Sequence, residues 1–172
     1  REATVAHAPL EPDSVRAVLV KIIERETPNA DHKRITLHSD LSDDPGVIMA
    51  GPIGLQVILG NLLNNAIKYT PEGGDVGITY RVSRPAHAVE VTITDSGIGI
   101  PAADMPSIFN EFIRARNAKE TQVTGTGIGL STVKTLVDRY RGVLTLESEE
   151  GRGTTVTVSL PLASKQAPRE PL

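Results

Sequence analysis

The sequence predicts an α+β fold: a two-layer α/β sandwich in which a mixed, mostly antiparallel sheet carries three helices on one face. Residues 75–83 and 88–94 alternate between apolar and polar side chains, which is typical of strands with one buried face. Residues 13–26, 52–69 and 128–141 carry apolar side chains at helical spacing along one stripe. Strands buried on both faces would instead be continuously apolar, so the alternation argues against helices on both sides of the sheet.

The remaining elements follow from shorter signals. We predict strands at 34–40 and 46–50, and two more at 143–148 and 154–160 on either side of the turn "EEGRGT". An edge strand is expected at 2–9. The first helix follows the capping candidates Asp13 and Ser14.

Residues 95–125 contain several glycines and two prolines and show little apolar periodicity. An irregular segment of this length within a compact domain is usually a functional lid. We therefore expect an N-terminal segment at 1–9, one domain at 10–162 that includes this lid, and a disordered tail at 163–172.

Composition narrows the class of protein. With 172 residues, of which 39% are hydrophobic and 23% charged, the chain suits one globular domain. A net charge of -3 with scattered lysines and arginines argues against a nucleic-acid surface. The absence of cysteine excludes disulfides, thiolate metal ligands and thiol nucleophiles. No apolar stretch approaches the ~20 residues of a membrane span, and the start of the chain does not resemble a signal peptide.

The stretch "GNLLNNAIKYT" combines a buried helical stripe with asparagines, although asparagine favours helix interiors poorly. Helical spacing places Asn61, Asn65, Lys68 and Tyr69 on one face. Amide oxygens suit Mg²⁺, which is often shared with substrate phosphates, and a lysine adds positive charge. A solvated helix face explains the same residues equally well.

Two glycine-containing motifs follow. In "DSGIGIP", Asp95 ends a strand, and Gly97 and Gly99 permit close approach or unusual backbone angles. A buried carboxylate there would accept a hydrogen bond from an exocyclic amine such as that of adenine, although a simple turn is the commoner explanation. In "GTGIGLS", glycine-rich backbone enters a helix and can present N–H groups to an anion. A glycine-rich hinge is the alternative.

Two further segments are candidates. "IFNEFIRA" holds both phenylalanines of the chain, Phe109 and Phe112, which would anchor the lid or dock a partner. Arg114 in the same segment would reach a phosphate, whereas a short amphipathic helix covering the core is the alternative. "GRGTT" leads into the last strand, where Thr154 would support the Asp95 carboxylate unless the segment is an ordinary hairpin.

Together and in this order, the motifs resemble the catalytic and ATP-binding domain of sensor histidine kinases, in the GHKL superfamily. The likeness spans roughly residues 10–162, with "NLLNNAIKY" as the N box, "DSGIG" as the G1 box, "FNEFIR" as the F box, "GTGIGL" as the G2 box and "GRGT" as the G3 turn. The F box separates histidine kinases from gyrase-like members. The resemblance implies a Bergerat ATP-binding fold with a lid that orders around nucleotide.

The resemblance also implies a role for each matching residue. Asn65 would coordinate Mg²⁺, with Asn61 beside the metal and phosphates. Lys68 and Arg114 would contact phosphate, and Phe112 would contact the helical partner domain. The nucleotide pocket would be formed by Tyr69, Asp95, Gly97, Gly99 and Thr154, and the phosphate edge of the lid by Gly125, Gly127, Gly129 and Leu130.

Two departures from the family pattern stand out. Thr124 occupies a position where many relatives have the first of two glycines, which would stiffen the lid. No histidine is followed by an acidic residue, as the phosphoacceptor of the family is. We therefore expect the ATP-binding half alone, with the dimerisation helices before Arg1.

The expected function is that of a two-component histidine kinase domain, which binds Mg-ATP and transfers the γ-phosphate to a histidine on a separate dimerisation domain. Expected partners are that domain and a response regulator. The isolated chain should be monomeric and cytoplasmic, with a parent protein either free or anchored to a membrane. The alternatives are a non-catalytic regulatory or scaffold module that binds ATP, and a GHKL protein serine kinase.

Overall fold

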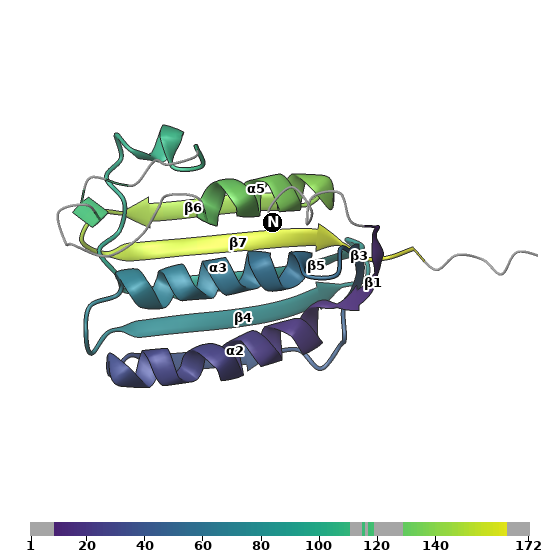
Figure 1. Ribbon diagram of the computed structural model, residues 1–172, viewed down its shortest axis with the longest axis horizontal. Helices are drawn as coiled ribbons and strands as arrows, with labels where there is room; N and C mark the ends of the chain where they lie inside the picture. The colour runs from purple at the N-terminus through teal and green to yellow at the C-terminus, as the bar shows by residue number, and fades with distance from the viewer. Residues whose placement is uncertain (1–8, 111–114, 116, 119–128, 165–172) are drawn as a thin grey trace, which may run out of the picture.

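The computed structural model describes residues 9–110, 115, 117, 118 and 129–164 (Figure 1). The helices are α2 (Val15–His32), α3 (Gly54–Tyr69) and α5 (Gly129–Arg139), with a short 3₁₀ helix η1 (Met105–Ser107). The strands are β1 (Glu11–Ser14), β2 (Thr36–Leu41), β3 (Val47–Ala50), β4 (Asp75–Ser83), β5 (Ala88–Asp95), β6 (Val143–Glu149) and β7 (Gly153–Pro161).

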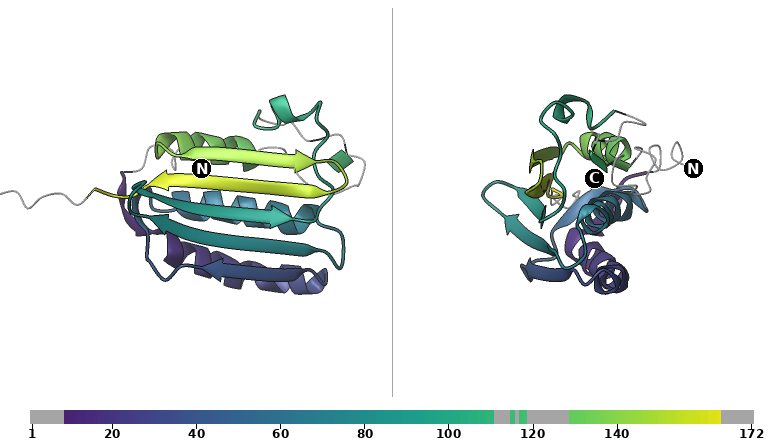
Figure 2. Two further views of the ribbon diagram at one scale, coloured as in Figure 1. Left: turned by 180° about the vertical axis from the view of Figure 1, so that it is seen from behind. Right: turned by 90° about the vertical axis from the view of Figure 1, so that its left-hand side faces the viewer.

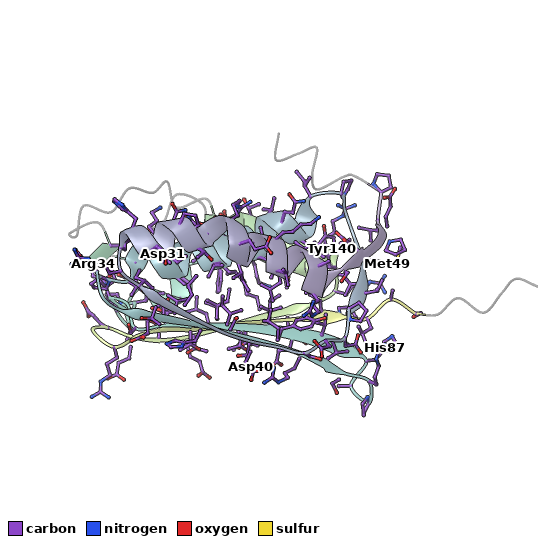
Figure 3. The ribbon with its side chains drawn as sticks, turned by 90° about the horizontal axis from the view of Figure 1, so that it is seen from below. Asp31, Arg34, Asp40, Met49, His87 and Tyr140 are labelled. Atoms are coloured by element: carbon purple, nitrogen blue, oxygen red, sulfur yellow. The ribbon has the colours of Figure 1, made fainter. Side chains whose placement is uncertain are left out.

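Five strands form the main sheet in the order β2-β4-β5-β7-β6. The β2–β4 pair is parallel and the other three pairs are antiparallel, which confirms the expectation of a mixed, mostly antiparallel sheet. The helices α2, α3 and α5 cover one face, and no helix of the described residues covers the other, open face (Figure 2). Asp40 lies on the open face, where it pairs with Arg81 (Figure 3).

The core fills the space between the sheet and the helices (Figure 3). The central helix α3 packs against both α2 and α5 and buries one apolar stripe completely. That stripe includes Leu55, Ile58, Leu59 and Leu63, each with no exposed surface. Burial of the stripe fixes the rotation of α3 about its axis, so the face that carries the asparagines remains outside the core.

Helix α2 is longer than the predicted 13–26. Ser14 caps its first turn by accepting a hydrogen bond at Oγ from the N–H of Ala17, 3.2 Å away. The helix then continues through Pro28 to His32, although proline lacks the N–H that an interior helical position normally donates. Its last turns bury Glu26 and Ala30, so tertiary packing outweighs the local preference to stop.

A two-stranded ribbon outside the main sheet was not predicted. β1 pairs with β3 in antiparallel register, from Glu11 opposite Ala50 to Ser14 opposite Val47. The sequence "EPDS" of β1 has little strand preference, so the partner strand determines its conformation. The edge strand predicted at 2–9 lies almost wholly outside the described residues, and Pro9, which is described, is not in a strand.

No helix among the described residues is long and apolar enough to cross a membrane.

Candidate functional site

A cavity of about 210 Å³ is formed beside the C-terminal half of α3. This end of α3 lies opposite the β1–β3 ribbon (Figure 1). The walls of the cavity come from the second half of α3, the strands β5, β6 and β7, the loop at 96–100, the described part of 108–118 and the start of α5. Its lining is Asn61, Leu62, Asn64, Asn65, Ala66, Lys68, Tyr69, Ile93, Asp95, Ile98, Gly99, Ile100, Ile108, Ala115, Ala118, Gly129, Leu130, Leu146, Thr154 and Val156.

The polar wall of the cavity is the exposed face of α3. Asn61, Asn65, Lys68 and Tyr69 all line it, as helical spacing predicts. The ammonium of Lys68 lies 5.5 Å from the centroid of the Tyr69 ring, within the range of a cation–π interaction. Asn64 also lines this wall. Asn64 was not predicted as a site residue, although its position three residues after Asn61 places it on the same face.

The side chain of Asn61 has a defined orientation. Its Nδ2 donates to the carbonyl oxygen of Val57 at 2.7 Å, so Oδ1 remains as the acceptor. A β-carbon added at Gly129 would lie 2.8 Å from this Oδ1. The first residue of α5 can approach the Asn61 amide this closely because Gly129 has no side chain.

Asp95 lies at the end of β5, where one of its carboxylate oxygens is held by backbone. Its Oδ1 accepts from the N–H of Gly97 at 2.8 Å and from the N–H of Thr154 at 3.2 Å. Burial raises the pKa of Asp95 above its usual value, and these two N–H groups act in the opposite direction. Among the described residues, we find no hydrogen bond to Oδ2, so that oxygen remains available to a ligand.

Thr154 supports Asp95 through its backbone rather than its side chain. The strand register places Thr154 directly opposite Asp95, whereas the Thr154 hydroxyl lies 2.8 Å from Oγ of Ser148. The support that was predicted from Thr154 is therefore supplied by its backbone N–H, which the strand pairing places opposite Asp95.

Glycine is required at two positions beside Asp95. A β-carbon at Gly97 would lie 2.7 Å from both Asp95 Oδ1 and the Tyr69 carbonyl oxygen. Gly99 has a φ of +67°, and a β-carbon there would lie 2.0 Å from the Glu149 carbonyl oxygen. Gly99 lines the cavity, whereas Gly97 does not and instead supports the carboxylate.

The apolar wall was not predicted. Ile93, Val156 and Leu146 are aligned across β5, β7 and β6 and form one part of it. Ile98, Ile100, Ile108, Ala115 and Ala118 form another part, and they belong to a second apolar cluster that includes Phe109. Apolar residues that line a cavity are indistinguishable in sequence from core residues, so only the packing reveals them.

Asn117 joins the segment after the F box to the loop at 96–100. Its Nδ2 donates to the carbonyl oxygens of Gly99 at 2.8 Å and Ile98 at 3.3 Å.

Four predicted residues lie outside the described part of the chain, namely Phe112, Arg114, Gly125 and Gly127.

The donor set suits a magnesium ion that is shared with a bound ligand. The described residues contain no group of three histidine, cysteine, aspartate or glutamate side chains able to hold a metal. The polar wall instead offers neutral amide oxygens beside a lysine, which do not repel phosphate. Such a wall fits Mg²⁺ that keeps several waters and is bound largely by substrate phosphates.

Residues 50–164 match the family described as Histidine kinase-, DNA gyrase B-, and HSP90-like ATPase. The chain belongs to this family. It is 38% identical over 109 residues to the sensor histidine kinase WalK of Bacillus subtilis (strain 168), covering 63% of this chain and 18% of WalK. It is 36% identical over 141 residues to the adaptive-response sensory kinase SasA of Synechococcus sp. (strain JA-2-3B'a(2-13)), covering 82% of this chain and 37% of SasA.

Solved structures agree with the fold. The mycobacterial sensor histidine kinase MprB matches with a TM-score of 0.75 and 28% identity, covering 89% of this chain and 97% of that one. Full-length ShkA in complex with AMPPNP matches with a TM-score of 0.76 and 27% identity, covering 94% of this chain and 33% of ShkA. The chain thus spans well under half of WalK and SasA, and it corresponds to the ATP-binding catalytic domain of sensor histidine kinases.

Proposed function

We propose that the cavity binds ATP together with Mg²⁺ and presents the γ-phosphate to a histidine on a separate helical dimerisation domain. The observation that carries the proposal is Asp95, a largely buried carboxylate with Oδ1 held by backbone and Oδ2 left for a ligand. An acceptor at the base of a partly apolar cavity suits the exocyclic amine of adenine. The AMPPNP complex of the related ShkA supports a nucleotide as the ligand.

The other residues have roles that fit this orientation. Asn65 and Asn61 would hold the metal and its water, and Lys68 would contact phosphate. Tyr69 and Gly99 would border the base, while Gly129 and Leu130 at the start of α5 would border the phosphates. The proposed phosphate contacts of Arg114, Gly125 and Gly127 lie outside the described residues.

The chain need not supply a covalent nucleophile. When bound, Mg²⁺ would neutralise charge on the phosphates. The residues of the chain would hold the nucleotide in position and keep water from the adenine ring. This arrangement suits phosphoryl transfer, which is catalysed mainly by positioning and charge neutralisation. The acceptor histidine, and then a response regulator as the next acceptor, would belong to the partners.

Calorimetric titration of the chain with ATP and Mg²⁺, alongside Asp95→Asn, tests the binding step. Binding that requires Asp95 supports the proposal, and no binding by folded wild type contradicts it. A histidine-bearing dimerisation domain is then added with labelled ATP. Acid-labile phosphate on that domain supports histidine transfer, acid-stable phosphate favours a serine kinase, and no transfer favours a regulatory module.

A further inference from the structure

Glu26 is the only charged residue that is buried among those the structure describes, with 5% of its surface exposed. It lies on α2 and does not line the cavity. A buried carboxylate is unfavourable unless it is paired and hydrogen-bonded, and an apolar residue at a helix interface avoids that penalty. The burial of Glu26 between two packed helices therefore depends on hydrogen-bond donors around its carboxylate.

Three donors surround the Glu26 carboxylate. Within α2, the Nε of Arg25 lies 3.1 Å from Oε1, and the Nδ2 of Asn29 lies 2.9 Å from Oε2. The third donor belongs to α3, where the Nδ2 of Asn64 lies 3.4 Å from Oε2. This last contact links the buried carboxylate to the polar wall of the cavity, because Asn64 lines it.

The contact determines the orientation of the Asn64 amide. An ionised carboxylate can only accept hydrogen bonds, so the nitrogen of the amide must face Glu26. The Oδ1 of Asn64 is then directed away from Glu26. Although 3.4 Å is long for a hydrogen bond, the reversed amide would place two partly negative oxygens against each other, so the preference for this orientation remains.

Asn61 provides a parallel on the same helix face. Its nitrogen is held by a carbonyl oxygen of α3, and its oxygen approaches Gly129 at the start of α5. Two of the three asparagines on this wall thus have the nitrogen engaged and the oxygen left as an acceptor. Acceptors of this kind suit the waters that a magnesium ion retains, because such waters donate hydrogen bonds.

We propose that Glu26 is a positioning residue that acts through Asn64. It holds the Asn64 amide so that its oxygen accepts a hydrogen bond from the hydrated magnesium–nucleotide group. This inference rests on the proposed function. It adds that a residue of α2 contributes to the strengthening of ATP binding by Mg²⁺. Outer-shell partners of this kind typically contribute tenfold or more to metal affinity.

The test compares ATP binding with and without Mg²⁺ by calorimetry. Glu26→Met removes the acceptor at similar volume, and it leaves no buried unpaired charge, because the side chain of its charged partner Arg25 is 57% exposed. Asn64→Ala removes the amide itself at an exposed position. Glu24→Met is the matched control, because Glu24 is an exposed glutamate of the same helix. Thermal unfolding of each variant reports stability separately.

We expect Glu26→Met and Asn64→Ala each to raise the Kd for ATP about tenfold in the presence of Mg²⁺. The Kd measured in EDTA should remain within about twofold of wild type, and Glu24→Met should change neither value, as expected for an exposed site far from such features. The double variant should bind like Asn64→Ala alone, because residues that act through one contact are not additive.

Equal weakening with and without Mg²⁺ would show that Glu26 only maintains packing, and would overturn the inference. Unchanged magnesium dependence in Asn64→Ala would also overturn it, whatever the stability of Glu26→Met. If wild type binds ATP through Asp95 but neither variant alters the magnesium dependence, only this inference fails. If folded wild type binds no ATP under either condition, the proposed function fails and the inference fails with it.

Discussion

Replacing Asp95 with asparagine should place a hydrogen-bond donor in the cavity where Oδ2 now offers an acceptor, and it should preserve the fold. The N–H groups of Gly97 and Thr154 both donate to Oδ1, at 2.8 Å and 3.2 Å. The new amide must keep its oxygen toward these two donors, because the opposite orientation would set NH₂ against N–H. Its nitrogen then occupies the place of Oδ2, and a donor replaces an acceptor.

The size of the effect follows from the bonds that change. An adenine amine facing this site would lose a charge-assisted hydrogen bond, worth about 1.5–3 kcal/mol. Two donors would then face each other without acceptors, which costs about 1–3 kcal/mol more. The sum of about 2.5–6 kcal/mol corresponds to a rise in the Kd for ATP on the order of 10²- to 10⁴-fold.

Calorimetry with ATP and with inosine triphosphate checks this reasoning. Inosine carries a carbonyl oxygen where adenine carries the amine, so Asp95→Asn should bind inosine triphosphate more tightly than ATP, and wild type should show the opposite order. The reasoning predicts a loss of at least about 10²-fold from the lost bonds. A variant that binds ATP within about threefold of wild type would refute the assignment of Asp95 to the adenine amine.

The same substitution makes a prediction about stability and pH. Burial raises the pKa of Asp95, so the folded state disfavours the charged carboxylate. The contribution of this group to stability is therefore fully present below its unfolded pKa and is lost as pH rises through the raised, folded pKa. Asp95→Asn should unfold at the same or a higher temperature than wild type near neutral pH, and the difference should shrink as the pH is lowered. A variant that is markedly less stable at neutral pH would contradict this sign.

Three further variants test the site and its support. Asn65→Ala should abolish the strengthening of ATP binding by Mg²⁺ and leave thermal unfolding unchanged; retained magnesium dependence would remove Asn65 as the metal ligand. Gly99→Ala should lower the free energy of unfolding in urea by about 1–3 kcal/mol more than Gly73→Ala, because both have positive φ but only Gly99 has backbone, at Glu149, in the way. Lys33→Met removes donation from Nζ to the last carbonyls of α3, at 2.8 and 3.0 Å, and should cost about 1.5–3 kcal/mol in the same assay.

Much of the fold was predictable because the apolar patterns are unambiguous. The strand β4 has the predicted bounds, and α3 ends where the turn signals at 70–75 begin. Prediction was wrong where tertiary contacts outweighed local preference, as in the extension of α2 through Pro28. It was incomplete where a strand depends on its partner, as in β1.

The candidate site was predictable in its polar residues. Asparagine on a helix face and a carboxylate followed by two glycines are unusual enough to be noticed singly, and their order along the chain makes the interpretation as a nucleotide site more specific. Asn64 and Asn117 were missed because each lies beside a stronger signal. The apolar wall was missed because Ile93, Val156 and Leu146 have the composition of any core.

The sequence by itself determined which chemical groups are available and, through its periodicities, that helices would cover one face of a sheet. These are local properties, which depend on residues a few positions apart. Only the tertiary structure decided which atoms act: the backbone N–H rather than the hydroxyl of Thr154, and the contact of Glu26 with Asn64 across two helices. Such choices depend on strand register and helix packing, because groups 59 and 38 residues apart in the chain become neighbours only when the core closes.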